Sequence, residues 1–128
     1  MGITGMNHFT VLTDDVPSTV AFYRDLLGLH DGERPDLGFP GAWLYTGDNA
    51  VLHIIGGRSR ESLKPGVIDH MAFSAADLRA TLDRIKVAGL ESVCRRQIGT
   101  GIWQVFVYDP NGARVELDFD PAEAGPAA

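Results

Sequence analysis

The stretch Ala50-Val51-Leu52-His53 returns later in the chain as Ala113-Arg114-Val115-Glu116, at an offset of 63 positions. Asn7-His8-Phe9 returns in the same way as Asp69-His70-Met71, at an offset of 62 positions. Two offsets that agree so closely predict two copies of one structural unit. Corresponding positions of such copies approach each other around a pseudo-twofold axis. We therefore expect four side chains that can bind a metal ion to meet at one point: His8, His53, His70 and Glu116.

The first copy, about residues 5–57, reads as a strand, a helix and three further strands. Asp14-Asp15-Val16-Pro17 supplies the acidic residues and the proline that are typical of a helix start, and Gly28 predicts the end of that helix. The expected strands cover residues 9–12, 29–33, 43–45 and 51–55, with a turn at 47–49.

The second copy, about residues 67–119, repeats this plan. A helix is expected over 76–88 and is followed by Gly89, and strands are expected over 68–74, 90–96, 102–108 and 114–119. The glycine-rich, polar segment 58–66 predicts a linker, and residues 120–128 predict a disordered tail. Two βαβββ units predict one α+β domain spanning 1–128, with a curled, cup-like mixed sheet and helices on its outer faces.

Composition limits the class of protein. A chain of 128 residues with 45% hydrophobic and 22% charged residues is typical of one soluble domain. The net charge of −6 argues against a nucleic-acid partner, and no apolar stretch is long enough to cross a bilayer. The single cysteine, Cys94, leaves no intrachain disulfide, so we expect a cytoplasmic protein without membrane association.

Four segments match a known family, and together they span residues 5–119. They are Asn7-His8, the stretch from Ala21 to Leu29, Asp69-His70, and the stretch from Asp109 to Glu116. In these segments the chain resembles the vicinal oxygen chelate superfamily, which includes glyoxalase I, extradiol dioxygenases, fosfomycin-resistance proteins and bleomycin-binding proteins. Among them it looks most like the glyoxalase I-like members with a single module.

The resemblance implies a paired βαβββ fold that holds one divalent metal ion. His8, His70 and Glu116 match three ligand positions of the family, whereas His53 stands where bacterial glyoxalase I has a glutamate. Imidazoles with a carboxylate suit Zn, Ni, Co, Mn or Fe. Without His53, the set becomes the two histidines and one carboxylate of non-haem iron oxygenases.

The surroundings of these residues set the remaining expectations. A lone histidine at the start of a strand is more often a hydrogen-bonded structural group, so the matched offset is what favours ligation. Glu116 alternates with two apolar neighbours and is expected to face the cup. Four aromatic side chains are expected to form the apolar walls of a substrate pocket: Phe39, Trp43, Trp103 and Phe106.

Three functions follow from the resemblance. The first is a metal-dependent lyase or isomerase like glyoxalase I, in which two neighbouring substrate oxygens bind the metal and Glu116 moves a proton between adjacent carbons. The second is an extradiol-type ring-cleaving dioxygenase, and the third is a non-catalytic binder of small molecules or drugs. A homodimer is expected, because single-module members of the family usually pair. Its metal sites are then either shared between chains or closed within each chain.

Overall fold

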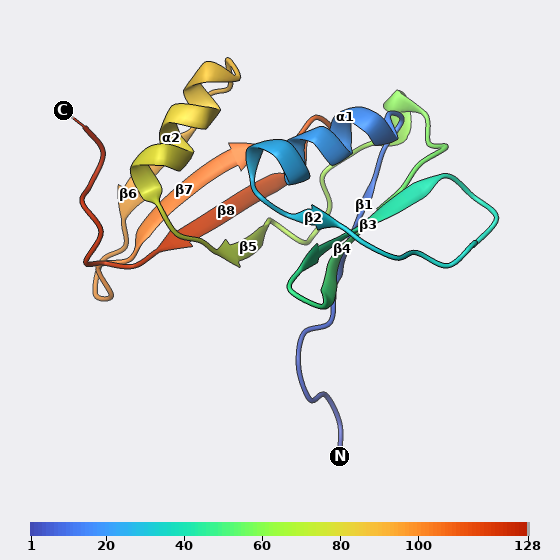
Figure 1. Cartoon of the computed structure of the whole chain (residues 1–128), viewed down its shortest axis with the longest axis horizontal. Helices are drawn as coiled ribbons and strands as arrows, with labels where there is room; N and C mark the ends of the chain where they lie inside the picture. Colours follow the sequence, from blue (N-terminus) through green and yellow to red (C-terminus); the bar gives the residue numbers. More distant parts are fainter. Residues whose placement is uncertain (128) are drawn as a thin grey trace. The chain divides into compact units, whose positions relative to one another are not determined.

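The computed structural model describes residues 1–127. The chain divides into two compact units, Met1–Lys64 and Pro65–Ala128, and the boundary falls inside the segment predicted as a linker. Each unit contains one open four-stranded mixed sheet, with elements in the order strand, helix, three strands, and the first unit adds a short 3-10 helix after its last strand (Figure 1). The predicted α+β class and the two βαβββ modules are confirmed.

The strand order in the two sheets is identical once equivalent strands are matched. The first sheet runs β1-β4-β3-β2 and the second β5-β8-β7-β6. In each sheet the first strand of the module pairs in parallel with the last, and the other pairs are antiparallel. The elements of the first unit are β1 (Phe9–Leu12), α1 (Val16–Val20), η1 (Ala21–Leu26), β2 (His30–Asp31), β3 (Gly41–Thr46), β4 (Asn49–Ile55) and η2 (Arg60–Ser62).

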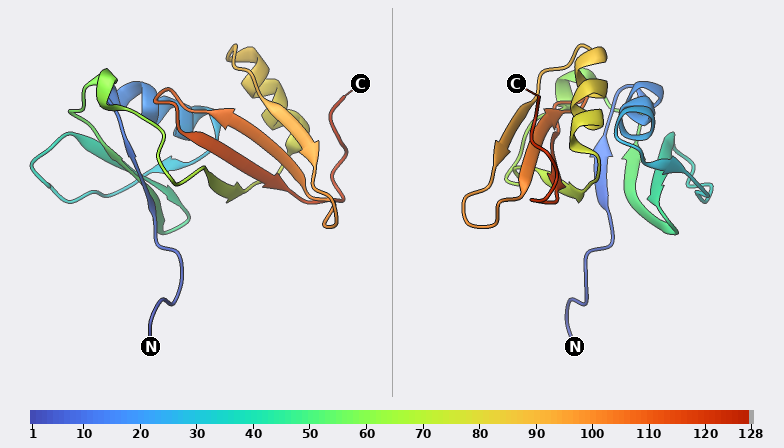
Figure 2. Two further views of the ribbon diagram at one scale, coloured as in Figure 1. Left: turned by 180° about the vertical axis from the view of Figure 1, so that it is seen from behind. Right: turned by 60° about the vertical axis from the view of Figure 1, so that its left-hand side comes forward.

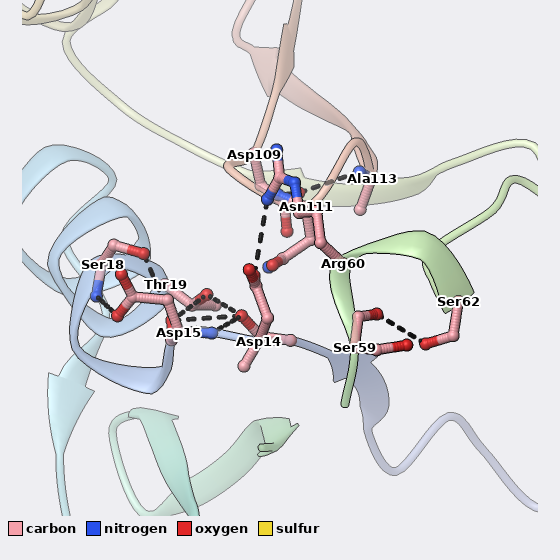
Figure 3. A network of polar contacts seen from close by, with 11 residues as sticks. Asp14, Asp15, Ser18, Thr19, Ser59, Arg60, Ser62, Asp109, Asn111 and Ala113 are labelled. Carbon is pink, nitrogen blue, oxygen red and sulfur yellow. Dashed lines mark hydrogen bonds and ion pairs between the residues drawn. The ribbon is translucent and has the colours of Figure 1, made fainter. Parts of the chain in front are cut away.

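The helix of the first unit starts and ends where the sequence predicts. Asp15 caps α1 by accepting a hydrogen bond from the Ser18 N–H at 3.1 Å (Figure 3). Pro17 occupies the first turn. After Val20 the helix widens into one π-helical turn, η1, and it ends at Gly28, whose φ is +90°. The helical segment buries Tyr23 completely, and α1 lies against β3 and β4.

The second unit contains β5 (Met71–Ser74), α2 (Leu78–Val87), β6 (Val93–Arg96), β7 (Trp103–Tyr108) and β8 (Arg114–Phe119). Helix α2, drawn in yellow, runs alongside the orange and red strands β7 and β8 (Figure 2). It buries Leu78, Thr81 and Ile85. Val105, Val107, Val115 and Leu117 alternate along β7 and β8 on the helix side and are at most 3% exposed. The other face carries Gln104, Phe106 and Glu116, which are also buried.

The segment after β8 differs from the disordered tail that the sequence predicts. Residues 120–127 fold back onto their own unit, while Ala128 lies outside the described residues. The Glu123 carboxylate accepts hydrogen bonds from the N–H groups of Asp77 and Leu78, at 3.2 and 2.7 Å. Asp77 has a left-handed backbone, with φ +67°, and its own side chain does not cap α2. The tail therefore supplies the N-terminal cap that helix α2 lacks.

Candidate metal centre

The first unit brings two of the predicted ligands together. His8 lies just before β1 and His53 lies in β4, and their imidazole rings are stacked with centroids 3.6 Å apart and an interplanar angle of 12°. The Trp43 indole of β3 stacks on His53 as well, at 4.1 Å and 10°. Thr10 of β1 and Trp43 of β3 are the strand partners of His53, so the stack crosses three neighbouring strands.

A neighbouring side chain fixes the tautomer of His8. Its Nδ1 lies 2.7 Å from Oδ1 of Asn7. An amide oxygen only accepts hydrogen bonds, so Nδ1 must donate and the lone pair of the neutral ring sits on Nε2. The partner on one ring nitrogen thus prepares the other nitrogen to bind a metal ion.

The second unit repeats this arrangement with the other two predicted ligands. His70 lies just before β5, and its Nδ1 is 2.7 Å from Oδ2 of Asp69, the residue equivalent to Asn7. The Nε2 of His70 is 3.1 Å from Oε1 of Glu116 in β8. Two ligands bound to one transition metal at about 2.1 Å and at a right angle lie about 3 Å apart. The observed separation therefore matches that of neighbouring ligands on one ion.

Glu116 is buried, with 7% of its surface exposed, on the face of β8 opposite Val115 and Leu117. Its Oε2 accepts a hydrogen bond from Gln104 Nε2 at 3.3 Å. Asp118, two residues further on the same face, is also hydrogen-bonded to it. Burial, and then this hydrogen bond and the negative charge of Glu116, raise the pKa of Asp118 to about 6. Sequence analysis missed Gln104 and Asp118, although the alternation of β8 identifies Asp118 as a neighbour of Glu116.

The charge state of His53 suits metal binding. Burial lowers its pKa, and the positive electrostatic influence of His8 and Arg34 lowers it further, while a backbone hydrogen bond at Ala50 acts in the opposite sense. His53 is therefore a neutral imidazole at neutral pH, and this is the form that binds metals.

The four predicted pocket residues have different surroundings. Trp43 stacks on His53, and Phe106 lies edge-on to His70 with centroids 6.0 Å apart. Phe39 is 42% exposed in the loop before β3. Trp103 corrects the prediction, because it lies on the face of β7 opposite Phe106. There its indole N–H donates to the Glu123 carbonyl at 3.1 Å, so Trp103 anchors the C-terminal segment.

The predicted ligands thus form one pair in each unit, and the two pairs occupy equivalent positions of the repeat. Within residues 1–127, the structure contains no group of three or more His, Cys, Asp or Glu side chains that could hold a metal ion. Among the same residues, no helix is both long and apolar enough to span a membrane.

Comparisons with known proteins agree with this architecture. The profile of the Glyoxalase/Bleomycin resistance protein/Dioxygenase superfamily matches residues 5–117. A protein of Arabidopsis thaliana, "Glyoxylase I 4", is 28% identical over 123 residues, which are 90% of this chain and 70% of that protein.

Solved structures share the fold at low sequence identity. A putative glyoxalase family protein from Bacillus anthracis aligns with a TM-score of 0.76 and 21% identity, covering 94% of this chain and 98% of that one. A variant of the fosfomycin resistance protein FosX from Listeria monocytogenes, complexed with Mn(II) and 1S,2S-dihydroxypropylphosphonic acid, aligns with a TM-score of 0.75 and 20% identity, covering 93% and 94%. The lactoylglutathione lyase from Agrobacterium tumefaciens aligns with a TM-score of 0.68 and 19% identity, covering 98% and 100%. The chain belongs to the glyoxalase/bleomycin resistance protein/dioxygenase superfamily.

Proposed function

We propose that this protein is a divalent-metal-dependent lyase or isomerase related to glyoxalase I, acting on a small substrate that presents two neighbouring oxygens. One observation carries the proposal. At equivalent positions of the repeat, His8 and His70 each have Nδ1 held by the preceding side chain, at 2.7 Å in both cases. Metal-ligating histidines typically have the other ring nitrogen held in this way, and the repeat holds both histidines alike.

The donor set fits a transition metal. We propose His8, His53, His70 and Glu116 as the ligands, and three imidazoles with one carboxylate suit Zn, Ni, Co, Mn or Fe. When bound, such a metal ion supplies a Lewis acid that polarises the two substrate oxygens. The FosX variant that shares the fold is complexed with Mn(II), which supports a divalent metal here.

Glu116 is the proposed proton carrier. A base that removes a proton from one substrate carbon and returns it to the next carbon must change its charge inside the site. Gln104 donates a hydrogen bond to one Glu116 oxygen, so the negative charge of Glu116 is stabilised when the proton leaves. The lactoylglutathione lyase among the structural relatives supports an isomerising or lyase reaction over a simple binding role.

A ring-cleaving dioxygenase is the second candidate, and the stacking of His53 favours it. The His8 and His53 rings are stacked face to face, 3.6 Å apart with 12° between their planes, so the two imidazoles are not arranged to hold one ion together. If His53 stays in this stack, His8, His70 and Glu116 remain as the facial set of non-haem iron oxygenases. A non-catalytic drug-binding protein is the third candidate, and it would bind no metal.

Metal content is the deciding experiment. Protein purified without chelators is expected to contain nearly one Fe, Mn, Ni, Co or Zn per chain by plasma mass spectrometry. His70→Ala should lose that metal, whereas His30→Ala, a change at an exposed histidine of β2, should keep it. Iron would favour the dioxygenase over the isomerase. A metal content near zero after reconstitution would refute both enzyme proposals and leave the binder.

We also propose a cytoplasmic homodimer, and mixing of variants tests how its sites are built. If each site combines His8 and His53 of one chain with His70 and Glu116 of the other, His8→Ala mixed with His70→Ala regains one complete site per mixed dimer. If each chain forms its own site, every site in the mixture still lacks either His8 or His70. Metal content of the separately purified and remixed variants distinguishes the two arrangements.

A further inference from the structure

Arg34 lies in the loop between β2 and β3 and is held there by one residue. Its Nη2 donates to the Phe39 carbonyl at 3.0 Å, and its guanidinium carbon is 5.1 Å from the centroid of the Phe39 ring. The residue is only partly exposed. These contacts use one of the five donors of the guanidinium and fix the direction of the others.

This cation has no counter-charge within its own unit. Arg34 forms no ion pair with any carboxylate of residues 1–64, and its Nε is buried without a hydrogen-bond partner. Arg24, in the same unit, pairs with both Asp25 and Asp31. A buried donor without a partner costs about 1–3 kcal/mol. The contacts of residues 1–64 therefore leave the charge and the Nε of Arg34 unmatched.

The guanidinium is placed at the start of β3, the strand that carries Trp43. Nη2 lies 3.0 Å from the point where a Cβ on Gly41 would be, and that Cβ would also lie 2.2 Å from the Ile54 carbonyl oxygen. Glycine at the start of β3 therefore leaves the space that Arg34 uses. Gly41 is two residues before Trp43 in β3, so the two positions lie on the same face of the strand, and Trp43 stacks on His53.

We propose that Arg34 binds an anionic oxygen group of the substrate, a carboxylate or a phosphonate, next to the Trp43–His53–His8 stack. The proposal rests on the function proposed above, because it places the charged end of the substrate beside the metal ligands of the first unit. The planar guanidinium matches two oxygens of a carboxylate or phosphonate and pairs with them in its fork geometry. The ligand thereby supplies the counter-charge that residues 1–64 do not.

A purely structural role for Arg34, as an anchor for Phe39 and its loop, makes a different prediction. In that case replacement of Arg34 alters stability but not the preference for anions over neutral molecules of the same shape. The test therefore compares glycolate with glycolamide, which differ in charge and little in size, and includes methylphosphonate to identify the preferred oxyanion.

The experiment uses the full chain, stripped of metal with a chelator and then exchanged into chelator-free buffer at pH 8, where His53 is neutral. The Trp43 indole N–H and the Gly41 amide are followed by nitrogen-edited NMR during each titration. Wild type should bind glycolate or methylphosphonate at least tenfold more tightly than glycolamide. Arg34→Gln should lose this preference, and Arg34→Lys should keep part of it. Arg58→Gln removes an exposed positive charge of the same unit and should behave as wild type.

The outcomes separate this proposal from the proposed function. Equal binding of glycolate and glycolamide by wild type, or unchanged glycolate binding by Arg34→Gln, overturns the anion site even if the protein holds a metal. Conversely, a protein that holds no metal but shows an Arg34-dependent preference for anions refutes the metalloenzyme and keeps the anion site. If Arg34→Gln does not fold, Arg34→Lys provides the test. Unchanged glycolate binding by Arg34→Lys would show that the planar guanidinium does not bind the anion through its paired N–H groups.

Discussion

Asp69 determines how well His70 can bind a metal ion, and changing it provides a graded test. The hydrogen bond between Oδ2 of Asp69 and Nδ1 of His70 is 2.7 Å long, which is typical of a charge-assisted bond. It fixes the tautomer and raises the basicity of Nε2, and loss of such a partner typically costs 10–100-fold in metal affinity. Arg114 donates to the same Asp69 oxygen at 2.9 Å.

Two substitutions at Asp69 are expected to give losses of metal affinity at the two ends of this range. Asp69→Asn keeps an acceptor oxygen but loses the negative charge, so we expect about a tenfold loss of affinity, at the lower end of the range for such partners. Asp69→Ala removes the acceptor altogether and should approach a 100-fold loss. The pKa of Asp69 is lowered, first by the hydrogen bond with His70 and then by that with Arg114, so both effects should persist from pH 6 to pH 8.

The assay is competition between the protein and a chromophoric chelator for Zn²⁺ or Co²⁺. Asp25→Asn is the matched control, because Asp25 is likewise an exposed carboxylate paired with an arginine, Arg24, but lies far from any predicted ligand in sequence. Equal metal affinity of wild type and Asp69→Ala would show that the His70–Asp69 bond does not serve a metal, and it would remove the main support for the proposed site.

Three further changes test the site and its supports. Asp118→Asn should stabilise the metal-free protein at pH 8 by about 1–2 kcal/mol, allowing for partial exposure. The gain should be absent at pH 4, because the raised pKa penalises the ionised form, and this penalty grows as pH rises from about 4 to 6. Urea unfolding at both pH values checks the sign, and an equal gain at both would contradict it. Glu123→Ala should cost about 1–2 kcal/mol by uncapping α2, with lost helix signal at low urea, whereas a neutral result would mean that the tail does not cap the helix. Gly41→Ala should cost about 2 kcal/mol because its Cβ would overlap the Ile54 carbonyl, while Gly66→Ala, with open space around it, should be neutral in the same melts.

The repeat made most of the fold predictable from the sequence. The two modules have the same strand order and the same pairing pattern, so residues related by the sequence offset occupy equivalent positions in the structure. The face of Glu116 was also predictable, since Val115 and Leu117 are buried on the opposite side of β8. Helix ends were readable where the signal is local, as at Asp15 and Gly28.

Features that depend on distant parts of the chain were not predictable in this way. Glu123 caps a helix 45 residues earlier, and no local pattern links it to Leu78. Trp103 was expected in a pocket, but its indole N–H donates to the Glu123 carbonyl, 20 residues later, and no local pattern links these two residues. Arg34 looked like an ordinary loop residue, and only its missing counter-charge distinguishes it.

The two modules have kept their geometry and diverged in charge, and this divergence assigns different tasks to them. At one pair of equivalent positions the first module has His53 and the second has Glu116. Around His53 lie the His8 ring and the charge of Arg34, which favour a neutral imidazole and attract an anion. Around Glu116 lie Gln104, which donates a hydrogen bond to it, and Asp118, whose pKa is raised to about 6. If both modules serve one metal ion, the first therefore orients the charged end of the substrate and the second moves its proton. Exchange of the equivalent residues, His53→Glu with Glu116→His, would preserve the metal-ligand count. It should nevertheless abolish turnover, because the carboxylate would then lie beside Arg34 and away from Asp118.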